Sequence, residues 1–233
     1  MPLAVSLQQL QTDALIRADM VNSPLYPTGA GVTDLNRLIN QGITEFYDLL
    51  IASGEDYYLS STTIATVSTT DTYALTNDFL AVKGVDINLG GQQYFSGLRF
   101  NWADRNLYKL AGTGWFYGQP VYYDLRGQNI VFMPAPQGIY TITVWYYPVP
   151  PVLSALSDTL DGVNGWDELV TLSAAIKMLK REESFDAADR LVADYAACKA
   201  RIQSRASKRN AGEPPRVTDI RRGNRAGWRR RVS

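Results

Sequence analysis

The residues of this chain that could carry out chemistry are few, and nearly all of them are carboxylates. The sequence contains no histidine and a single cysteine, so it lacks the commonest general base and the commonest metal ligand. Ser/His and Cys/His nucleophile pairs are therefore excluded, and a zinc site would have to rest on carboxylates. We expect the protein not to be an enzyme, and we expect no metal and no cofactor.

Four carboxylates remain as acid–base candidates: Glu55, Asp56, Asp104 and Asp124. Two carboxylates alone can hydrolyse a glycoside, but the spacing of these four does not define such a pair. The alternative is that they are ordinary exposed loop residues. The glycines at 90–91 and 112–114 do not form a phosphate-binding loop, because the required spacing and the following Lys-Ser/Thr are absent.

The single cysteine, Cys198, lies at a helical apolar position between Tyr195 and Ile202. We interpret it as a small buried hydrophobic residue rather than a nucleophile. A single cysteine cannot form a disulfide within the chain, so nothing points to an oxidising compartment.

The formal net charge is zero, but the charges are separated along the chain. From Lys199 to the end there are 12 basic and 2 acidic residues, a net charge of +10, whereas residues 1–198 carry −10. This separation is typical of an interaction tail on a separately folded body.

The end of the chain has the composition of such a tail. Pro214 and Pro215 cannot continue a helix, and the segment after them has almost no apolar surface to bury. We expect it to be disordered alone and to become ordered on a partner, with Trp228 as an anchor. The alternative is a solvated basic tail without a specific partner. The predicted contact residues are Arg216, Arg221, Arg222, Arg225, Trp228, Arg229, Arg230 and Arg231.

Apolar residues at helical spacing predict helices on both sides of the chain's middle. The clearest helix follows Thr33, a candidate N-cap, and ends near residues 53–54. Gly42 in its middle costs about 1 kcal/mol relative to Ala, which indicates either a close helix–helix contact or a tolerated weakness. The apolar stripes are Leu7, Leu10, Ala14, Leu15 and Ala18; Leu35, Leu38, Ile39, Ile43, Phe46, Leu49 and Leu50; Trp166, Leu169, Leu172, Ile176 and Leu179; and Ala188, Leu191, Tyr195, Cys198 and Ile202.

The middle of the chain, residues 57–148, holds 19 of the 26 aromatic residues and most of the turn signals. Segments rich in β-branched and aromatic residues predict strands at 62–68, 79–88, 92–100, 115–123, 129–133 and 140–147. The glycine-containing segments 89–92 and 125–128 predict hairpin turns. Residues 102–109 are a short helix or an extended arm.

These elements predict an α+β protein in which N- and C-terminal helices form a bundle, with an inserted antiparallel β-sandwich or barrel-like domain and an extended C-terminal tail. The expected divisions are residues 1–56, 57–150, 151–210 and 211–233. No stretch approaches the ~18 consecutive apolar residues of a membrane span, and no secretory signal is expected. We expect no membrane partner.

The aromatic side chains of the β region have several possible roles. They could stack sugars or single-stranded nucleic acid, form protein interfaces, or simply pack in the β core. Adjacent aromatic residues in a strand point to opposite faces, so one side could be covered by a neighbouring subunit. The candidates for a subunit or tail-protein interface are Trp102, Arg105, Trp115, Tyr117, Tyr123 and Tyr146.

Several motifs, in their order along the chain, resemble those of head-to-tail adaptor (connector) proteins of tailed bacteriophages. Residues 73–80 resemble the family's Tyr-x-Leu-Pro-x-Asp-Phe segment, although Thr76 stands where proline is frequent. The other similar segments are 35–40, 45–50, 55–58, 132–136, 145–148 and 166–170. The similarity covers most of residues 7–220.

This resemblance implies a structural virion protein at the head–tail junction. The expected assembly is a ring, commonly of twelve subunits, that joins the portal protein to a downstream tail protein (nozzle or tail tube) and forms part of the channel through which DNA passes. The C-terminal segment would reach the portal, and assembly would take place in the host cytoplasm.

Two other hypotheses remain open from the residues themselves. A nucleic-acid-binding protein could use the same basic tail, and its affinity would fall steeply with added salt. A carbohydrate-binding β module could use exposed Trp and Tyr side chains.

Overall fold

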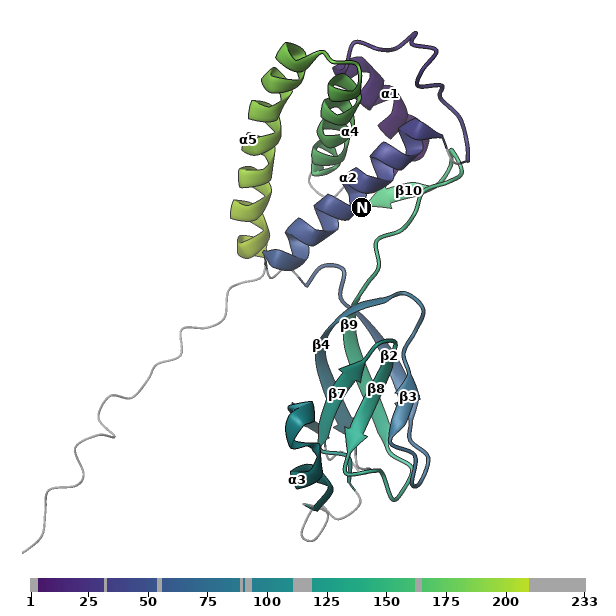
Figure 1. Cartoon of the computed structure of the whole chain (residues 1–233), viewed down its shortest axis with the longest axis vertical. Helices are drawn as coiled ribbons and strands as arrows, with labels where there is room; N and C mark the ends of the chain where they lie inside the picture. The colour runs from purple at the N-terminus through teal and green to yellow at the C-terminus, as the bar shows by residue number, and fades with distance from the viewer. Residues whose placement is uncertain are drawn as a thin grey trace, which may run out of the picture.

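The computed structural model describes residues 4–31, 33–53, 56–88, 90, 94–110, 119–161 and 165–209. Within these residues the chain is α+β, as predicted, with most of the helices at one end and the two larger sheets at the other (Figure 1). The barrel-like alternative is wrong, because both four-stranded sheets are open and end in edge strands. The domain divisions remain predictions.

Four helices form what we call the helical part: α1 (Leu7–Arg17), α2 (Asp34–Ala52), α4 (Asp167–Arg181) and α5 (Phe185–Arg209). Ser6 begins α1 through a capping box with Gln9, and Thr33 caps α2 by accepting a hydrogen bond from the Asn36 amide, as predicted. The apolar stripes of all four helices meet in one hydrophobic cluster. Trp166 is the largest fully buried side chain in this cluster.

A two-stranded sheet closes the helical part beside α1. In it, β1 (Ala4–Ser6) pairs antiparallel with β10 (Thr159–Asp161), and the Leu7 amide donates to the Asp158 carbonyl at 2.8 Å. The sequence analysis missed both strands, because three residues are too few to show alternation. Val5 and Leu160 are partners in this sheet and are both buried in the helical cluster.

Two four-stranded sheets and a short helix form what we call the β part. The first sheet has the order β2 (Ser60–Ala65), β9 (Thr141–Pro148), β4 (Phe79–Asn88) and β5 (Tyr94–Ser96). The second has the order β3 (Thr72–Ala74), β8 (Asn129–Met133), β7 (Tyr122–Arg126) and β6 (Leu98–Arg99). Strands β4 and β8 have the predicted bounds, whereas β3 was not predicted.

The pairing within the sheets is antiparallel except between β6 and β7. The expectation of a purely antiparallel region is therefore wrong at this edge. Parallel neighbours need a crossover connection, and the chain between these two strands includes η1 (Trp102–Asp104) and α3 (Arg105–Leu110). The predicted turn between β7 and β8 is confirmed, with Gly127 at a φ of +59°.

Among the residues that the structure describes, the second sheet is covered on both of its faces and the first sheet on one. Inward side chains of both sheets share one cluster, to which Val144 comes from β9 and Phe132 from β8. On the other side of β8, Val131 and Met133 pack with aromatic residues of η1 and α3. Residues 102–109 are therefore a helical cover rather than an extended arm.

Gly42 lies where α2 passes close to α4. A Cβ atom at this position would lie 3.0 Å from the backbone carbonyl oxygen of Val170 and 3.3 Å from its Cα. Of the two alternatives for Gly42, the close helix–helix contact is therefore the one present. Backbone atoms cannot move aside as a flexible side chain can, so a larger residue would not fit without a shift of the helices.

We expect Gly42→Ala to lower the melting temperature, although Ala is the better helix former by about 1 kcal/mol. Overpacking of this kind costs about 1–3 kcal/mol. Gln41→Ala, at the exposed position beside it, is the matched control and should change stability by about 0.5 kcal/mol or less. A more stable Gly42→Ala protein would show that the contact is loose.

Candidate interaction surfaces

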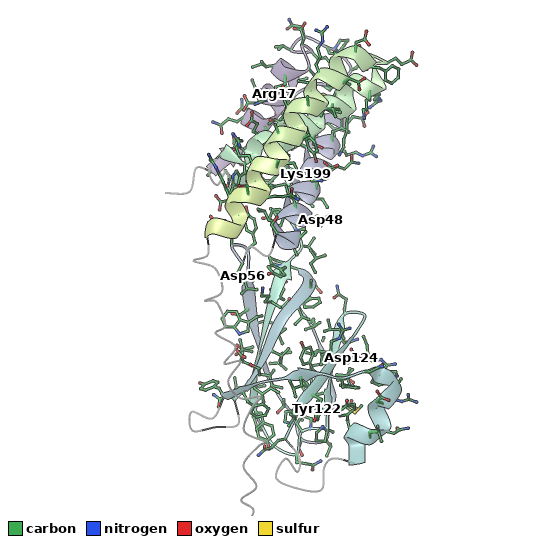
Figure 2. All side chains as sticks on the ribbon, turned by 90° about the vertical axis from the view of Figure 1, so that its left-hand side faces the viewer. Arg17, Asp48, Asp56, Tyr122, Asp124 and Lys199 are labelled. Atoms are coloured by element: carbon green, nitrogen blue, oxygen red, sulfur yellow. The ribbon has the colours of Figure 1, made fainter. Side chains whose placement is uncertain are left out.

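The helical part and the β part are joined by residues 53–59 and 148–158, and Asp56 lies at this junction (Figure 2). Its Oδ1 accepts a hydrogen bond from the Tyr147 hydroxyl at 2.7 Å and forms an ion pair with Lys83 Nζ at 3.0 Å. Tyr147 belongs to β9 and Lys83 to β4, so one carboxylate just after α2 holds two strands of the first sheet. The Tyr147 hydroxyl and the Lys83 ammonium lower the pKa of Asp56.

A tyrosine cluster supports the same junction. The Tyr58 ring stacks on Tyr47 of α2 with a centroid separation of 4.3 Å, and the Tyr57 hydroxyl donates to the Asp161 carboxylate of β10. Burial raises the pKa of Tyr47 to about 12, and burial also raises the pKa of Tyr58. Both phenols are therefore neutral near pH 7, and their role here is packing.

A second polar cluster lies on the outer side of the second sheet. The Arg126 guanidinium carbon lies 3.9 Å from the centroid of the Trp102 ring, and that of Arg105 lies 5.5 Å from it. Arg99 Nε lies 3.5 Å from the carboxylate of Asp124, a buried residue of β7. We call Trp102, Arg105 and Arg126 the arginine–tryptophan face. Cation–π contacts of this kind contribute about 0.5–1 kcal/mol each at exposed sites.

The four carboxylates considered for catalysis lie in different places. Asp56 is in the junction, Asp124 is in an ion pair on β7, and Asp104 is an exposed residue of η1. Glu55 lies outside the described residues.

The predicted interface residues also separate into groups. Trp102 and Arg105 are half-buried on the outer side of the second sheet. Tyr123 and Tyr146 are 7% and 4% exposed and pack in the β core, so within the subunit they offer almost no surface to a partner. Their burial agrees with the alternative role given above, in which these aromatic rings pack in the β core. Trp115, Tyr117 and all the predicted tail residues (Arg216, Arg221, Arg222, Arg225, Trp228, Arg229, Arg230 and Arg231) lie outside the described residues.

Sequence reasoning did not name Trp145, an aromatic residue that faces outward. It lies on β9 in the open face of the first sheet and is 37% exposed. Its indole Nε1 donates to Asp86 Oδ2 on β4 at 2.7 Å. Alternation within residues 145–147 indicated that the rings take opposite faces, but not which ring takes which face.

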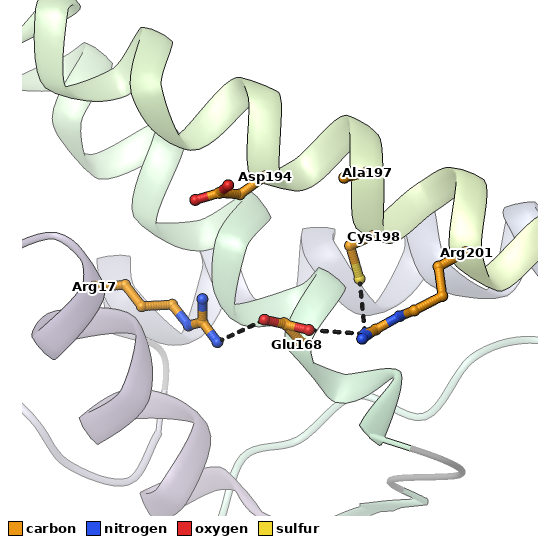
Figure 3. Close-up of a pocket in the computed structure, with 6 residues that line it drawn as sticks. All are labelled: Arg17, Glu168, Asp194, Ala197, Cys198 and Arg201. Atoms are coloured by element: carbon orange, nitrogen blue, oxygen red, sulfur yellow. Dashed lines mark hydrogen bonds and ion pairs between the residues drawn. The ribbon is translucent and has the colours of Figure 1, made fainter.

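A shallow hollow of about 400 Å³ lies between α1, α4 and α5 in the helical part (Figure 3). Within it, Glu168 of α4 forms ion pairs with Arg17 of α1 at 3.1 Å and with Arg201 of α5 at 2.7 Å. Cys198 lines the hollow and is 5% exposed, as expected, and burial raises the pKa of its thiol. The protonated thiol is a poor nucleophile. The polar side chains of the hollow therefore have a structural role, in which Glu168 connects three helices.

A second carboxylate, Glu45, connects α2 to α4 and α5. Glu45 of α2 accepts hydrogen bonds from Lys177 at 2.8 Å and Ser173 at 2.7 Å on α4, and from Tyr195 on α5 at 3.3 Å. Burial opposes ionisation of Glu45, but these donors together lower its pKa. The carboxylate therefore remains charged and ties α2 to both C-terminal helices.

We expect Asp56→Asn to lower the melting temperature at pH 7 by about 2–4 °C, the size of one partly exposed ion pair. Because folding lowers the pKa of Asp56, its contribution is present above the pKa of the unfolded chain and is lost as the pH falls through the folded value. The native protein should therefore lose more stability than the variant between pH 7 and pH 3.

The matched control is Asp48→Asn, an exposed carboxylate on α2 (Figure 2). This variant should melt like the native protein at pH 7. Equal pH profiles for the native protein and Asp56→Asn, followed by thermal unfolding, would contradict a stabilising role for the junction carboxylate.

A family model described as SU10 adaptor protein matches residues 5–224, nearly the whole chain. The search of curated proteins found no match to the chain. None of the helices in the described residues is long and apolar enough to cross a membrane. Within those residues there is also no group of three or more His, Cys, Asp or Glu side chains that could hold a metal ion.

Proposed function

The chain belongs to the SU10 adaptor protein family, and from this premise we propose that it forms a ring that joins a bacteriophage portal to the tail. The family is one of structural phage proteins, and the resemblance to head-to-tail adaptors seen in the sequence motifs is confirmed. The single observation that carries the proposal is the extent of the match, which reaches from the first described strand into the basic tail.

The reversal of charge along the chain supports a portal-binding role for the tail. Residues 199–233 carry +10 against −10 for the rest, and charged segments steer and align their partners. The residues proposed to make the contact are the seven arginines between 216 and 231 and Trp228. Repetition around a ring would turn weak single contacts into firm attachment through multivalency.

The negative charge of residues 1–198 supports a place for the ring around DNA. Binding to phosphates needs a cationic surface, so an acidic wall would let DNA pass without gripping it. In this arrangement the helices form the wall of the ring, and the β part, with its two sheets packed as one unit, faces outward or toward the downstream tail protein. A role without catalysis accords with the lack of histidine. The proposed ring has twelve subunits.

Deleting residues 211–233 should abolish docking onto purified portal while leaving the folded body intact. The reason is that this deletion removes the residues proposed to reach the portal but none that the structure describes. Co-sedimentation of adaptor with portal measures docking, and thermal unfolding checks the body. Undiminished docking of the truncated protein would reject the proposed role of the tail.

A matched pair of full-length variants separates charge from length. Changing Arg225, Arg229, Arg230 and Arg231 to Lys should largely preserve docking, whereas changing the same four to Gln should weaken it by at least about tenfold. Tight, salt-sensitive binding of the native tail to free duplex DNA, with no affinity for portal, would instead favour the nucleic-acid-binding alternative.

A further inference from the structure

We propose that the open face of the first sheet, around Trp145 and Asp86, binds the arginine–tryptophan face of a second copy of this chain. The proposal rests on the ring assembly proposed above and names the surfaces that form one of its contacts. The two faces belong to the same β part, and they lie on its opposite sides.

The open face is left uncovered by the part of the chain that the structure describes. Most residues that face outward on it are hydroxyl-bearing or small, and the Trp145 and Tyr94 rings and the Asp86 carboxylate lie among them. The register places Ser61 opposite Trp145 on one side and Gly84 opposite it on the other. A Cβ at Gly84 would meet nothing within 4 Å, so the surface beside the indole is open.

The opposite side of the β part carries the arginine–tryptophan face. There Arg126 is exposed and lies on the Trp102 ring. Leu98 and Leu107 add apolar surface nearby, at 56% and 66% exposed. Aromatic residues and arginine are enriched in protein interfaces relative to the rest of the surface.

The charges on the two faces are complementary and unpaired. Among the ion pairs of the described residues, none includes Arg126 and none includes Asp86. Both sheets lie between these two groups, so they cannot meet within one subunit. In a second copy, the same two groups can pair.

The tryptophans identify the same two places. Of the three tryptophans in the described residues, Trp166 is buried in the helical part. The other two, Trp102 and Trp145, are partly exposed. Trp102 lies beside the positive charge of Arg126 and Trp145 beside the negative charge of Asp86. Trp145 is also held by its hydrogen bond to Asp86, and preorganised aromatic anchors are typical of the energetic centre of an interface.

A contact between two different faces has a consequence for symmetry. It is heterologous, so each subunit uses one face for the preceding copy and the other face for the following copy, and the chain of contacts closes into a ring when the rotation allows. A two-fold dimer would need the same patch on both partners, and neither face is complementary to itself in charge.

Charge reversal on the full-length protein tests this contact. Arg126→Glu and Asp86→Lys should each weaken self-association by at least about tenfold, whereas the double variant should recover most of it because the pair is restored in the opposite sense. Self-association is measured by analytical ultracentrifugation across protein concentrations. Thermal unfolding verifies that each variant folds.

The matched control is Arg190→Glu, which makes the same charge change at an exposed position of α5 and should associate like the native protein. A second measurement does not depend on strong association. In a Cys198→Ser background, the double variant Ser61→Cys/Leu98→Cys changes one exposed residue beside each face and keeps Arg126 and Asp86. With a short bis-maleimide crosslinker it should give a ladder of oligomers, and either cysteine alone should give no more than dimers.

The outcomes separate this contact from the adaptor role. If the reversed variants assemble normally, or if no ladder forms, the proposed contact is wrong even when the tail still docks onto portal. If the reversals block binding of a downstream tail protein but not self-association, the faces serve that partner and the proposal is likewise overturned. Loss of association in the single variants with recovery in the double variant supports it.

Discussion

The β part is tied to the helices at one narrow place, and its orientation depends on the Asp56 carboxylate there. Tyr147 and Lys83 approach this carboxylate from β9 and β4, the two central strands of the first sheet. The tyrosine stack on α2 fills the space beside it. This small set of contacts connects the order of the helices to that of the sheets.

The body of the subunit is held together differently at its two ends. In the helical part, Glu168 and Glu45 each connect three helices around an apolar core. In the β part, the two sheets contact each other through apolar side chains, and charged residues such as Arg126 and Asp86 lie on the outer faces. Among the described residues, charged contacts therefore connect the helices, whereas Arg126 and Asp86 on the sheets take part in no ion pair.

The sequence predicted the long elements well and the short ones poorly. Helix α2 shows a full apolar stripe with a Thr33 cap, and β4 and β8 have enough β-branched residues to set their bounds. Strands β1, β3 and β10 have three residues each, and their pairing depends on distant partners. Gly42 could be assigned to a close contact only once the position of Val170 was known. The outward direction of Trp145 could be assigned only once its neighbours Val144 and Tyr146 were known to pack in the β core.

The pairing of β1 with β10 bears on the order in which the chain folds during synthesis. The first strand has no partner until residues 159–161 have been made, and Trp166 and helix α4 arrive later still to fill the space among α1, α2 and α5. The sheets need only residues 60–148 and can form first, since units of a chain fold as they emerge from the ribosome. Until α4 and α5 have been made, the two N-terminal helices therefore keep exposed an apolar surface that a chaperone or a neighbouring nascent chain can reach.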